Sequence, residues 1–189
     1  MRGIFPTVLL AAVVLQPSSA AAQQPARVLN IASTPNWPAA RPADVASEDA
    51  IIAALYDVIS GPKGQPRDWN RMRSIFVPGA RLMPAVVRDS GRRADLLVWT
   101  VDEYISTAGP SLEASGFFER ELHRVTERYG NVTQIFSTYD SKRTLDDPAP
   151  FARGINSIQL LKDGGRYWVV SIFWDSERPG NPVPAKYLP

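Results

Sequence analysis

The stretch from residue 155 to residue 174 constrains the fold of this chain more than any other part of the sequence. Its centre reads KDGG at residues 162–165, and paired glycines readily adopt the positive φ angles that a tight hairpin turn requires. The flanking runs, residues 155–161 and 167–174, are rich in the β-branched and aromatic residues that strands prefer. The stretch therefore predicts a β-hairpin.

The second strand of this hairpin is apolar on both faces, because side chains alternate along a strand. The alternation predicts that one face carries Trp168, Val170, Ile172 and Trp174, and that the other carries Tyr167, Val169, Ser171 and Phe173. A strand of this kind must be covered on both sides. We expect helices on one side, and a further layer or a second subunit on the other.

The first half of the chain supplies the helices. Ser47, Asp68 and Thr100 are each placed as helix N-caps, and Thr100 begins a capping-box spacing that ends at Glu103. We expect three helices after these caps, the third broken or kinked at Pro110. Between the second and third helices, residues 80–88 and 95–99 read as a pair of strands.

Two further strands are expected before the hairpin. Residues 132–141 are apolar or β-branched and follow a turn at Gly130-Asn131. Residues 119–129 are ambiguous, because their apolar residues fit a helical face while their glutamates and arginines alternate as in a strand with charged neighbours.

The N-terminus has the pattern of a signal peptide. Arg2 precedes an apolar run at residues 4–15, and Ala20-Ala21-Ala22 provides a cleavage pattern, so cleavage is expected after Ala22. An uncleaved membrane anchor is the alternative. We expect a signal peptide over residues 1–22, an extended Pro- and Ala-rich leader over 23–45, one domain over 46–178, and a C-terminal tail over 179–189. Export predicts a periplasmic or secreted protein that has no membrane contact after cleavage.

Composition excludes several classes of site. The chain has no cysteine and a single histidine, His123, so thiol chemistry, thiolate metal sites and two-histidine sites are excluded. We expect no metal and no cofactor. The net charge is +2 and the arginines are scattered, so a nucleic-acid partner is not expected.

Two segments resemble the NTF2-like superfamily and, within it, the SnoaL-like group. One reads GFFERE at residues 116–121 and continues through YGNV at 129–132 to FSTY at 136–139. The other reads RGINSIQL at residues 153–160 and ends in the aromatic strand WVVSIFWD at 168–175. The resemblance covers roughly residues 47–175 and favours a strand for residues 119–129.

The resemblance implies an α+β cone, in which a strongly curved mixed sheet wraps around three N-terminal helices. It implies a pocket between the concave face of the sheet and the helices, and a homodimer formed through the outer face. We expect the pocket to bind a small apolar molecule.

Six residues are predicted to line that pocket and to bind the ligand: Trp69, Tyr104, Tyr139, Asn156, Ile172 and Trp174. Asn156 is expected to donate to a ligand carbonyl group, and Tyr139 to donate or accept. Glu119 and His123 are weak catalytic candidates, because regular alternation would place them on one strand face, where a carboxylate could orient an imidazole.

The sequence leaves three functions open. The first is an exported binding module for a small apolar molecule. The second is an enzyme of the ketosteroid-isomerase, dehydratase or epoxide-hydrolase type that uses an acid or base in the pocket. The third is a dimeric protein-interaction module. A buried carboxyl group at the pocket floor, facing a Tyr or an Asn, would favour the enzyme.

Overall fold

The computed structural model describes residues 31, 34, 36–89 and 93–189. The predicted signal peptide, its cleavage after Ala22 and the first part of the leader, residues 23–30, lie outside these residues. Among the described residues, no helix is both long and apolar enough to cross a membrane.

The three predicted helices are present and start where their caps predict. They are α2 (Glu48–Ile59), α3 (Trp69–Ile75) and α4 (Val101–Ser115). Ser47 accepts a hydrogen bond at the start of α2, Asp68 does so at the start of α3, and Thr100 forms the full capping box of α4.

The structure adds two details on the helical half. Pro110 does not break α4, which continues through it to Ser115. The leader is not extended throughout, because Pro42–Val45 form a short helix, α1. Buried Asp44 of α1 forms an ion pair with Arg71 of α3 at 2.7 Å, and Trp37 donates from Nε1 to the Phe76 carbonyl at 3.0 Å. These contacts attach this part of the leader to the domain.

The strands form one six-stranded sheet in the order β2-β1-β6-β5-β4-β3. Only β1 and β6 pair in parallel, and every other pair is antiparallel, so the sheet is mixed. The strands are β1 (Phe76–Arg88), β2 (Arg93–Leu96), β3 (Phe118–Tyr129), β4 (Val132–Lys142), β5 (Ala152–Asp163) and β6 (Arg166–Ser176). Residues 118–129 are therefore a strand, which resolves the ambiguity of that segment.

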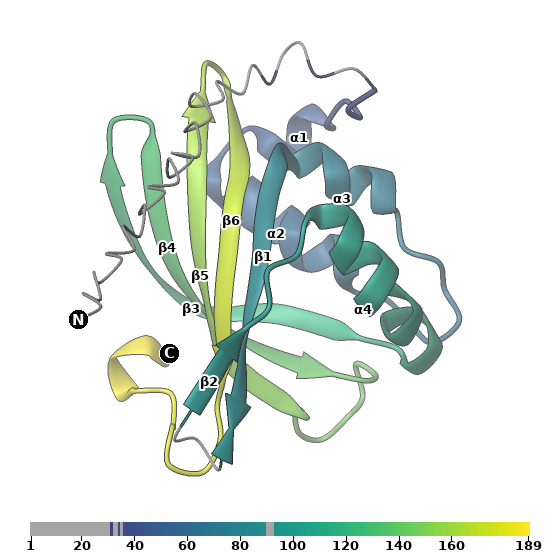
Figure 1. Cartoon of the computed structure of the whole chain (residues 1–189), viewed down its shortest axis with the longest axis vertical. Helices are drawn as coiled ribbons and strands as arrows, with labels where there is room; N and C mark the ends of the chain where they lie inside the picture. Colours follow the sequence, from purple (N-terminus) through teal and green to yellow (C-terminus); the bar gives the residue numbers. More distant parts are fainter. Residues whose placement is uncertain (1–30, 32–33, 35, 90–92) are drawn as a thin grey trace, which may run out of the picture.

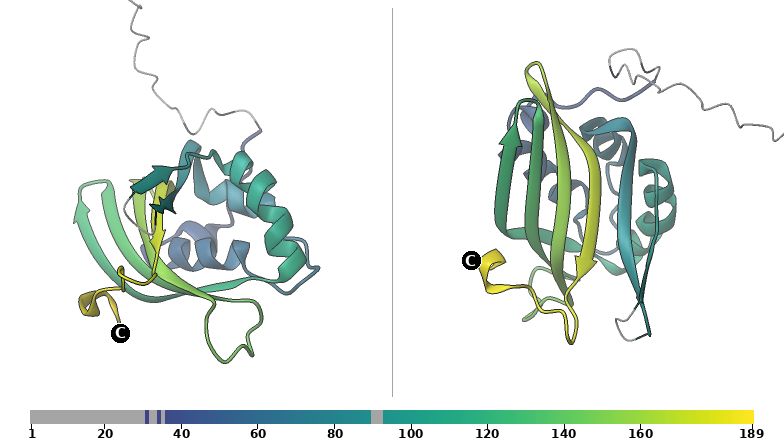
Figure 2. Two further views of the ribbon diagram at one scale, coloured as in Figure 1. Left: turned by 60° about the horizontal axis from the view of Figure 1, so that its bottom comes forward. Right: turned by 60° about the vertical axis from the view of Figure 1, so that its left-hand side comes forward.

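The sheet curves around the helices. Figure 1 shows β3 to β6 on one side and the helices on the other, and in Figure 2 the sheet bends around α2. The core lies between them, where Ile51 and Ile52 of α2 and Ile135 and Ile158 of the sheet are almost fully buried. The predicted α+β cone, with a curved mixed sheet around the helices of the first half, is confirmed.

Two irregularities shift the side-chain alternation. On β6, a register shift opposite Gln159 and Leu160 leaves Val170 without a partner. The single alternation predicted for residues 167–174 is therefore wrong. Val169 is fully buried beside β1, while Val170 is 37% exposed. On β3, a second shift between Glu121 and His123 leaves Leu122 as the extra residue.

The C-terminal tail lies against the outer face of the sheet. Its short helix η3 (Ala185–Tyr187) places the Tyr187 ring 5.3 Å from the Phe136 ring, and Thr138 donates to the Tyr187 carbonyl at 2.6 Å. We refer to residues 177–189 as the C-terminal strap. Figure 2 shows it on the side of the sheet away from the helices.

Candidate functional site

A cavity of about 230 Å³ lies between the concave face of the sheet and the helices. Ile172 and Trp174 of β6 line it from the sheet, and Tyr104 of α4 lines it from the helices. Phe117 and the half-exposed Phe151 also line it, with their rings packed edge to face at 6.1 Å. The cavity is where the sequence predicted a pocket.

The size of the cavity restricts what it can hold. Pockets for drug-sized ligands measure roughly 300–1,000 Å³, and each water in the liquid takes about 30 Å³. A volume of about 230 Å³ is therefore suited to a compound with one small ring or a short chain. Its lining is mostly apolar, with a few polar groups from Glu119, Ser141 and Asn156.

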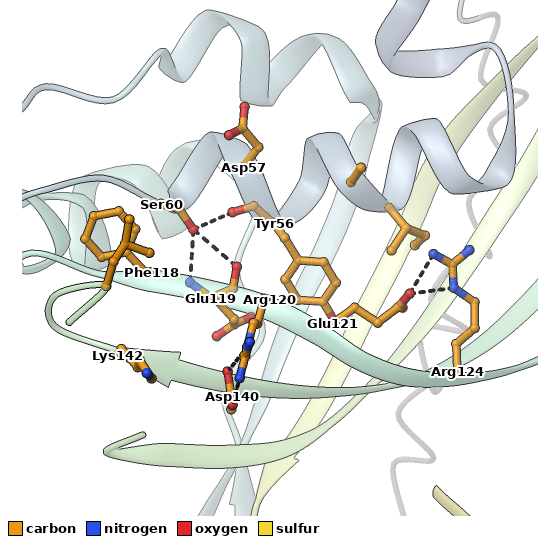
Figure 3. A pocket seen from close by; sticks show the side chains of 13 residues that line it. Tyr56, Asp57, Ser60, Phe118, Glu119, Arg120, Glu121, Arg124, Asp140 and Lys142 are labelled. Carbon is orange, nitrogen blue, oxygen red and sulfur yellow. Dashed lines mark hydrogen bonds and ion pairs between the residues drawn. The ribbon is translucent and has the colours of Figure 1, made fainter. Parts of the chain in front are cut away.

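Glu119 is the acidic residue of this lining. It lies near the start of β3 opposite Ser141 of β4, and the Ser141 hydroxyl donates to its Oε2 at 2.9 Å. The backbone of Glu119 is also held from the other side, because its N–H donates to Ser60 Oγ at 3.0 Å (Figure 3). Ser60 follows α2, so this helix and β4 together fix the position of the carboxyl group.

The surroundings of Glu119 favour its neutral form. Burial raises its pKa from 4.5 to about 7, and the negative charge of Asp140 acts in the same direction. Hydrogen bonds from Ser141 and Asn156 oppose this shift but do not cancel it. A carboxyl group with a pKa near neutrality can both accept and release a proton at physiological pH.

A second hollow, of about 440 Å³, lies between α2 and β3 and shares Glu119 and Tyr56 with the cavity. We call it the α2–β3 groove, and Figure 3 shows its charged lining. Arg120 and Asp140 form a two-bond ion pair there, at 2.9 and 3.1 Å. The side chains of Glu119 and Tyr56 lie between the two hollows.

A chain of hydrogen bonds runs behind the cavity wall. The Asn156 amide nitrogen donates to the Tyr56 hydroxyl at 3.2 Å, and the Tyr56 and Ser137 hydroxyls lie 2.7 Å apart. Ser137 donates to Glu121, which forms an ion pair with Arg124 at 2.6 Å. All of these groups except the two charged ones are buried.

Two other tyrosines face the cavity. Burial and the neighbouring Glu119 charge raise the pKa of Tyr104, and its hydroxyl has no hydrogen-bond partner among the described residues. Tyr139 lies opposite Gly154, and its hydroxyl is 3.2 Å from that of Ser176. Burial raises the pKa of Tyr139 to about 12. Both tyrosines are therefore neutral hydrogen-bonding groups at physiological pH.

Five of the six predicted ligand-binding residues line the cavity: Tyr104, Tyr139, Asn156, Ile172 and Trp174. Their role in binding a ligand remains a prediction. Trp69 does not line it, which corrects the predicted position. Its indole donates to Glu113 at 3.1 Å and packs against Gly109, so Trp69 joins α3 to α4.

Glu119 and His123 do not form a pair. The extra residue Leu122 shifts the alternation, so Glu119 shares the inner face with Ser141 while His123 shares the outer face with Thr138. Thr138 faces the C-terminal strap. The predicted carboxylate–imidazole pair is therefore wrong, and the catalytic role of Glu119 alone remains a prediction.

Several polar residues of the site were not predicted. Tyr56 lies on α2, and its spacing from Ile52 and Ile59 places the three residues on one helix face. That spacing was a usable signal. Ser137 and Ser141 carry no such signal, because their positions on the inner face depend on the register of β4. Within the described ranges, no group of three or more His, Cys, Asp or Glu residues could hold a metal ion.

No family model and no curated protein matches the chain. The solved structures that match include an NTF2-like protein of unknown function from Silicibacter pomeroyi, at 15% identity and a TM-score of 0.48, over 68% of this chain and 92% of that one. Another is an NTF2-like protein of unknown function from Methylobacillus flagellatus, at 15% identity and a TM-score of 0.45, over 70% of this chain and 95% of that one. A third is a presumed ketosteroid isomerase from Parabacteroides distasonis, at 10% identity and a TM-score of 0.45, over 69% of this chain and 88% of that one.

These matches are similarities alone, and the description of the chain as an α+β cone rests on its own element order and sheet topology. None of them tests the narrower SnoaL-like group. With identities this low and TM-scores below 0.5, they carry no argument about activity.

Proposed function

We propose that the protein is an acid–base enzyme that transfers a proton to or from a small, largely apolar molecule bound in the cavity. The observation that supports this function is the position of Glu119, a carboxyl group with a pKa of about 7 in an otherwise mostly apolar lining. A purely apolar floor would have favoured a simple binding protein.

The residues around the cavity suggest a division of roles. Glu119 is the proton acceptor, because its ionised form is costly in this environment and gains by taking a proton. The Tyr104 hydroxyl is available to donate a hydrogen bond to an oxygen atom of the substrate, since it forms no hydrogen bond with any of the described residues. Ser141 and Ser60 hold Glu119 in position.

The test is a search for turnover that depends on Glu119. A pool of small metabolites is incubated in D₂O with the wild-type protein, with Glu119→Gln, and with Glu127→Gln, which changes an exposed glutamate of the same strand. Mass spectrometry then identifies compounds that gain deuterium or change in mass. We expect at least one such compound with the wild type and Glu127→Gln, and none with Glu119→Gln. Equal products from all three proteins would contradict the proposal.

A binding module for a small apolar molecule is the second candidate, and the mostly apolar lining of the cavity favours it. It predicts a compound that co-purifies unchanged with both the wild type and Glu119→Gln. Native mass spectrometry of freshly purified protein would detect such a compound.

We further propose that the protein is exported to the periplasm or secreted, and that it forms a homodimer through the outer face of the sheet. The sequence of residues 1–22 supports export, and N-terminal sequencing of protein from the periplasmic fraction tests for cleavage after Ala22. The exposed Phe173 and Val125 on the outer face support the dimer.

A further inference from the structure

The hydrogen-bond chain behind the cavity has a fixed direction. Arg124 donates to the Glu121 carboxylate in two close contacts, at 2.7 and 2.6 Å, so Glu121 is the acceptor at this end of the chain. Ser137 must therefore give its only hydroxyl hydrogen to Glu121. The Tyr56 hydroxyl, 2.7 Å from Ser137, is then the donor in that contact.

This direction determines how the Asn156 side chain is turned. Because the Tyr56 hydrogen is used on Ser137, the Tyr56 oxygen can only accept from Asn156, and the Asn156 amide nitrogen must face it. The contact with Tyr56 therefore holds the amide nitrogen, and the amide oxygen points away from Tyr56.

The amide oxygen of Asn156 is open to the cavity. Asn156 is 7% exposed and lines the cavity from the sheet. Among the residues that the structure describes, Trp168 Nε1 is the one fully enclosed side-chain polar atom that lacks a partner. Asn156 Oδ1 accepts no hydrogen bond from those residues, so it is not enclosed, and the cavity is the space that it faces.

We propose that Asn156 Oδ1 is a fixed hydrogen-bond acceptor, and that the cavity selects small apolar ligands carrying a hydroxyl or amino donor. This reverses the role that the sequence suggested for Asn156, which was to donate to a carbonyl group. The inference rests on the proposed use of the cavity as a ligand site. It does not depend on catalysis by Glu119.

The selectivity follows from the cost of leaving a polar group unpaired. A ligand that presents a carbonyl oxygen to Oδ1 places two acceptors together and displaces any water there, whereas an alcohol of the same shape forms a hydrogen bond. Cyclohexanol, cyclohexanone and cyclohexane have nearly the same size and are suitable probes. NMR titration that follows the Asn156 side-chain amide and the Ile172 methyl groups gives their dissociation constants.

We expect the wild-type protein to bind cyclohexanol about tenfold more tightly than cyclohexanone, a ratio typical of one hydrogen bond. Asn156→Leu removes the acceptor at similar volume, so the ratio should fall to about one. Ser137→Ala leaves the acceptor in place but frees the Tyr56 hydrogen to turn toward Asn156, so the ratio should also fall. Ser157→Ala is the matched control, because Ser157 lies on the outer face of the same strand, where it bonds Gln134.

A urea titration shows whether each variant folds. If Asn156→Leu does not fold, the binding ratio of Ser137→Ala tests whether Asn156 Oδ1 is a fixed acceptor. An equal or stronger preference for cyclohexanone in the wild type, or a preference for cyclohexanol that persists in Ser137→Ala, would overturn the proposal. Failure of all three probes to shift the Ile172 signals would overturn it as well. If the wild type prefers cyclohexanol over cyclohexanone as expected, but Glu119→Gln keeps full turnover, only the enzymatic proposal is refuted.

Discussion

At the scale of single residues, the site combines one destabilising group with several that hold it in place. The Glu119 carboxyl lies in a mostly apolar cavity wall and accepts from Ser141 of the sheet, while the backbone N–H of Glu119 donates to Ser60 next to α2. A carboxyl group in such a position weakens the fold whenever it is ionised, because burial penalises its charge. Its retention at this cost is consistent with a functional role.

The first prediction concerns the pH dependence of stability. The folded-state pKa of Glu119, about 7, lies above its ordinary value of 4.5, so between these pH values the folded protein holds a proton that the unfolded chain has released. The free energy of unfolding should therefore fall as pH rises from 4.5 to 7. Glu119→Gln removes this fall, and its advantage over the wild type should grow by on the order of 3 kcal/mol between pH 4 and pH 8.

Urea unfolding of both proteins at pH 4, 6 and 8 measures this difference. Glu127→Gln, on the exposed end of the same strand, is the control and should parallel the wild type. A constant difference between Glu119→Gln and the wild type at all three pH values would show that Glu119 is not perturbed.

The second prediction concerns Gly154, which faces Tyr139 across the inner side of the sheet. A Cβ atom at this position would clash with the Asp175 carbonyl oxygen and would lie 2.7 Å from the Tyr139 hydroxyl. Gly154→Ala should therefore lower the free energy of unfolding by about 2 kcal/mol or more. Gly165→Ala is the matched control, since a Cβ there has nothing within 4 Å, and thermal unfolding compares the two. Equal stability of the two variants would mean that the wall around Tyr139 is looser than described.

Five of the six residues predicted from the sequence to line the cavity do line it, but the directions in which some side chains point could not be predicted. Tyr104, Tyr139 and Asn156 could be assigned to the cavity because the resemblance implied which side of the sheet is concave, and regular alternation and helical spacing then placed these residues. The face of His123 could not be predicted, because the extra residue Leu122 changes the alternation and no local sequence signal indicates this irregularity. The direction of the Asn156 amide depends on partners from three separate elements, which only the folded chain brings together.

At the scale of elements, helix starts were the most predictable features and strand irregularities the least. Helix caps depend on residues within one turn, so Ser47, Asp68 and Thr100 were identified directly. The register shifts in β3 and β6 depend on how neighbouring strands and helices pack. On β3 the shift turns Arg124 toward Asp49 and Arg128 toward Glu48, and these ion pairs hold the strand against α2.

The third prediction tests the start of α4, the helix that carries Tyr104 into the cavity. Thr100 accepts from the Glu103 N–H at 3.2 Å, and its own N–H donates to the Glu103 carboxylate at 2.7 Å. Thr100→Ala should cost about 1 kcal/mol in the free energy of unfolding, measured by urea titration. Ser106→Ala, within the exposed part of the same helix, should change it by less than about half that amount. A larger loss from Ser106→Ala would argue against the capping explanation.

At the scale of the whole molecule, the outer face of the sheet is a surface on which the fold leaves large apolar side chains exposed. A row of paired residues crosses it from β3 to β1: Val125, Phe136, Ser157, Phe173 and Met83. The strap covers Phe136 through Tyr187, but Phe173 and Val125 remain 47% and 41% exposed. The predicted second layer is therefore partly supplied by the chain itself, and a second subunit is proposed for the remainder.

The fourth prediction follows from this surface. Phe173→Glu should convert the proposed homodimer into a monomer, because it places a charge at the centre of an apolar contact. Sedimentation equilibrium measures the mass in solution. Leu145→Glu, which changes a side chain that is 70% exposed in the loop after β4, should leave the mass unchanged. A wild-type protein that is already monomeric at high concentration would contradict the proposed dimer.

The course of the strap also bears on how such measurements are done. Val183 is buried and Glu177 forms a two-bond ion pair with Arg153, so the chain is held against the outer face before it reaches Pro189. An affinity tag fused after Pro189 would emerge beside Tyr187, on the same side of the protein as Phe173. An affinity tag at that end would block the face through which the homodimer is proposed to form. The tag should therefore be removed before the molecular mass in solution is measured.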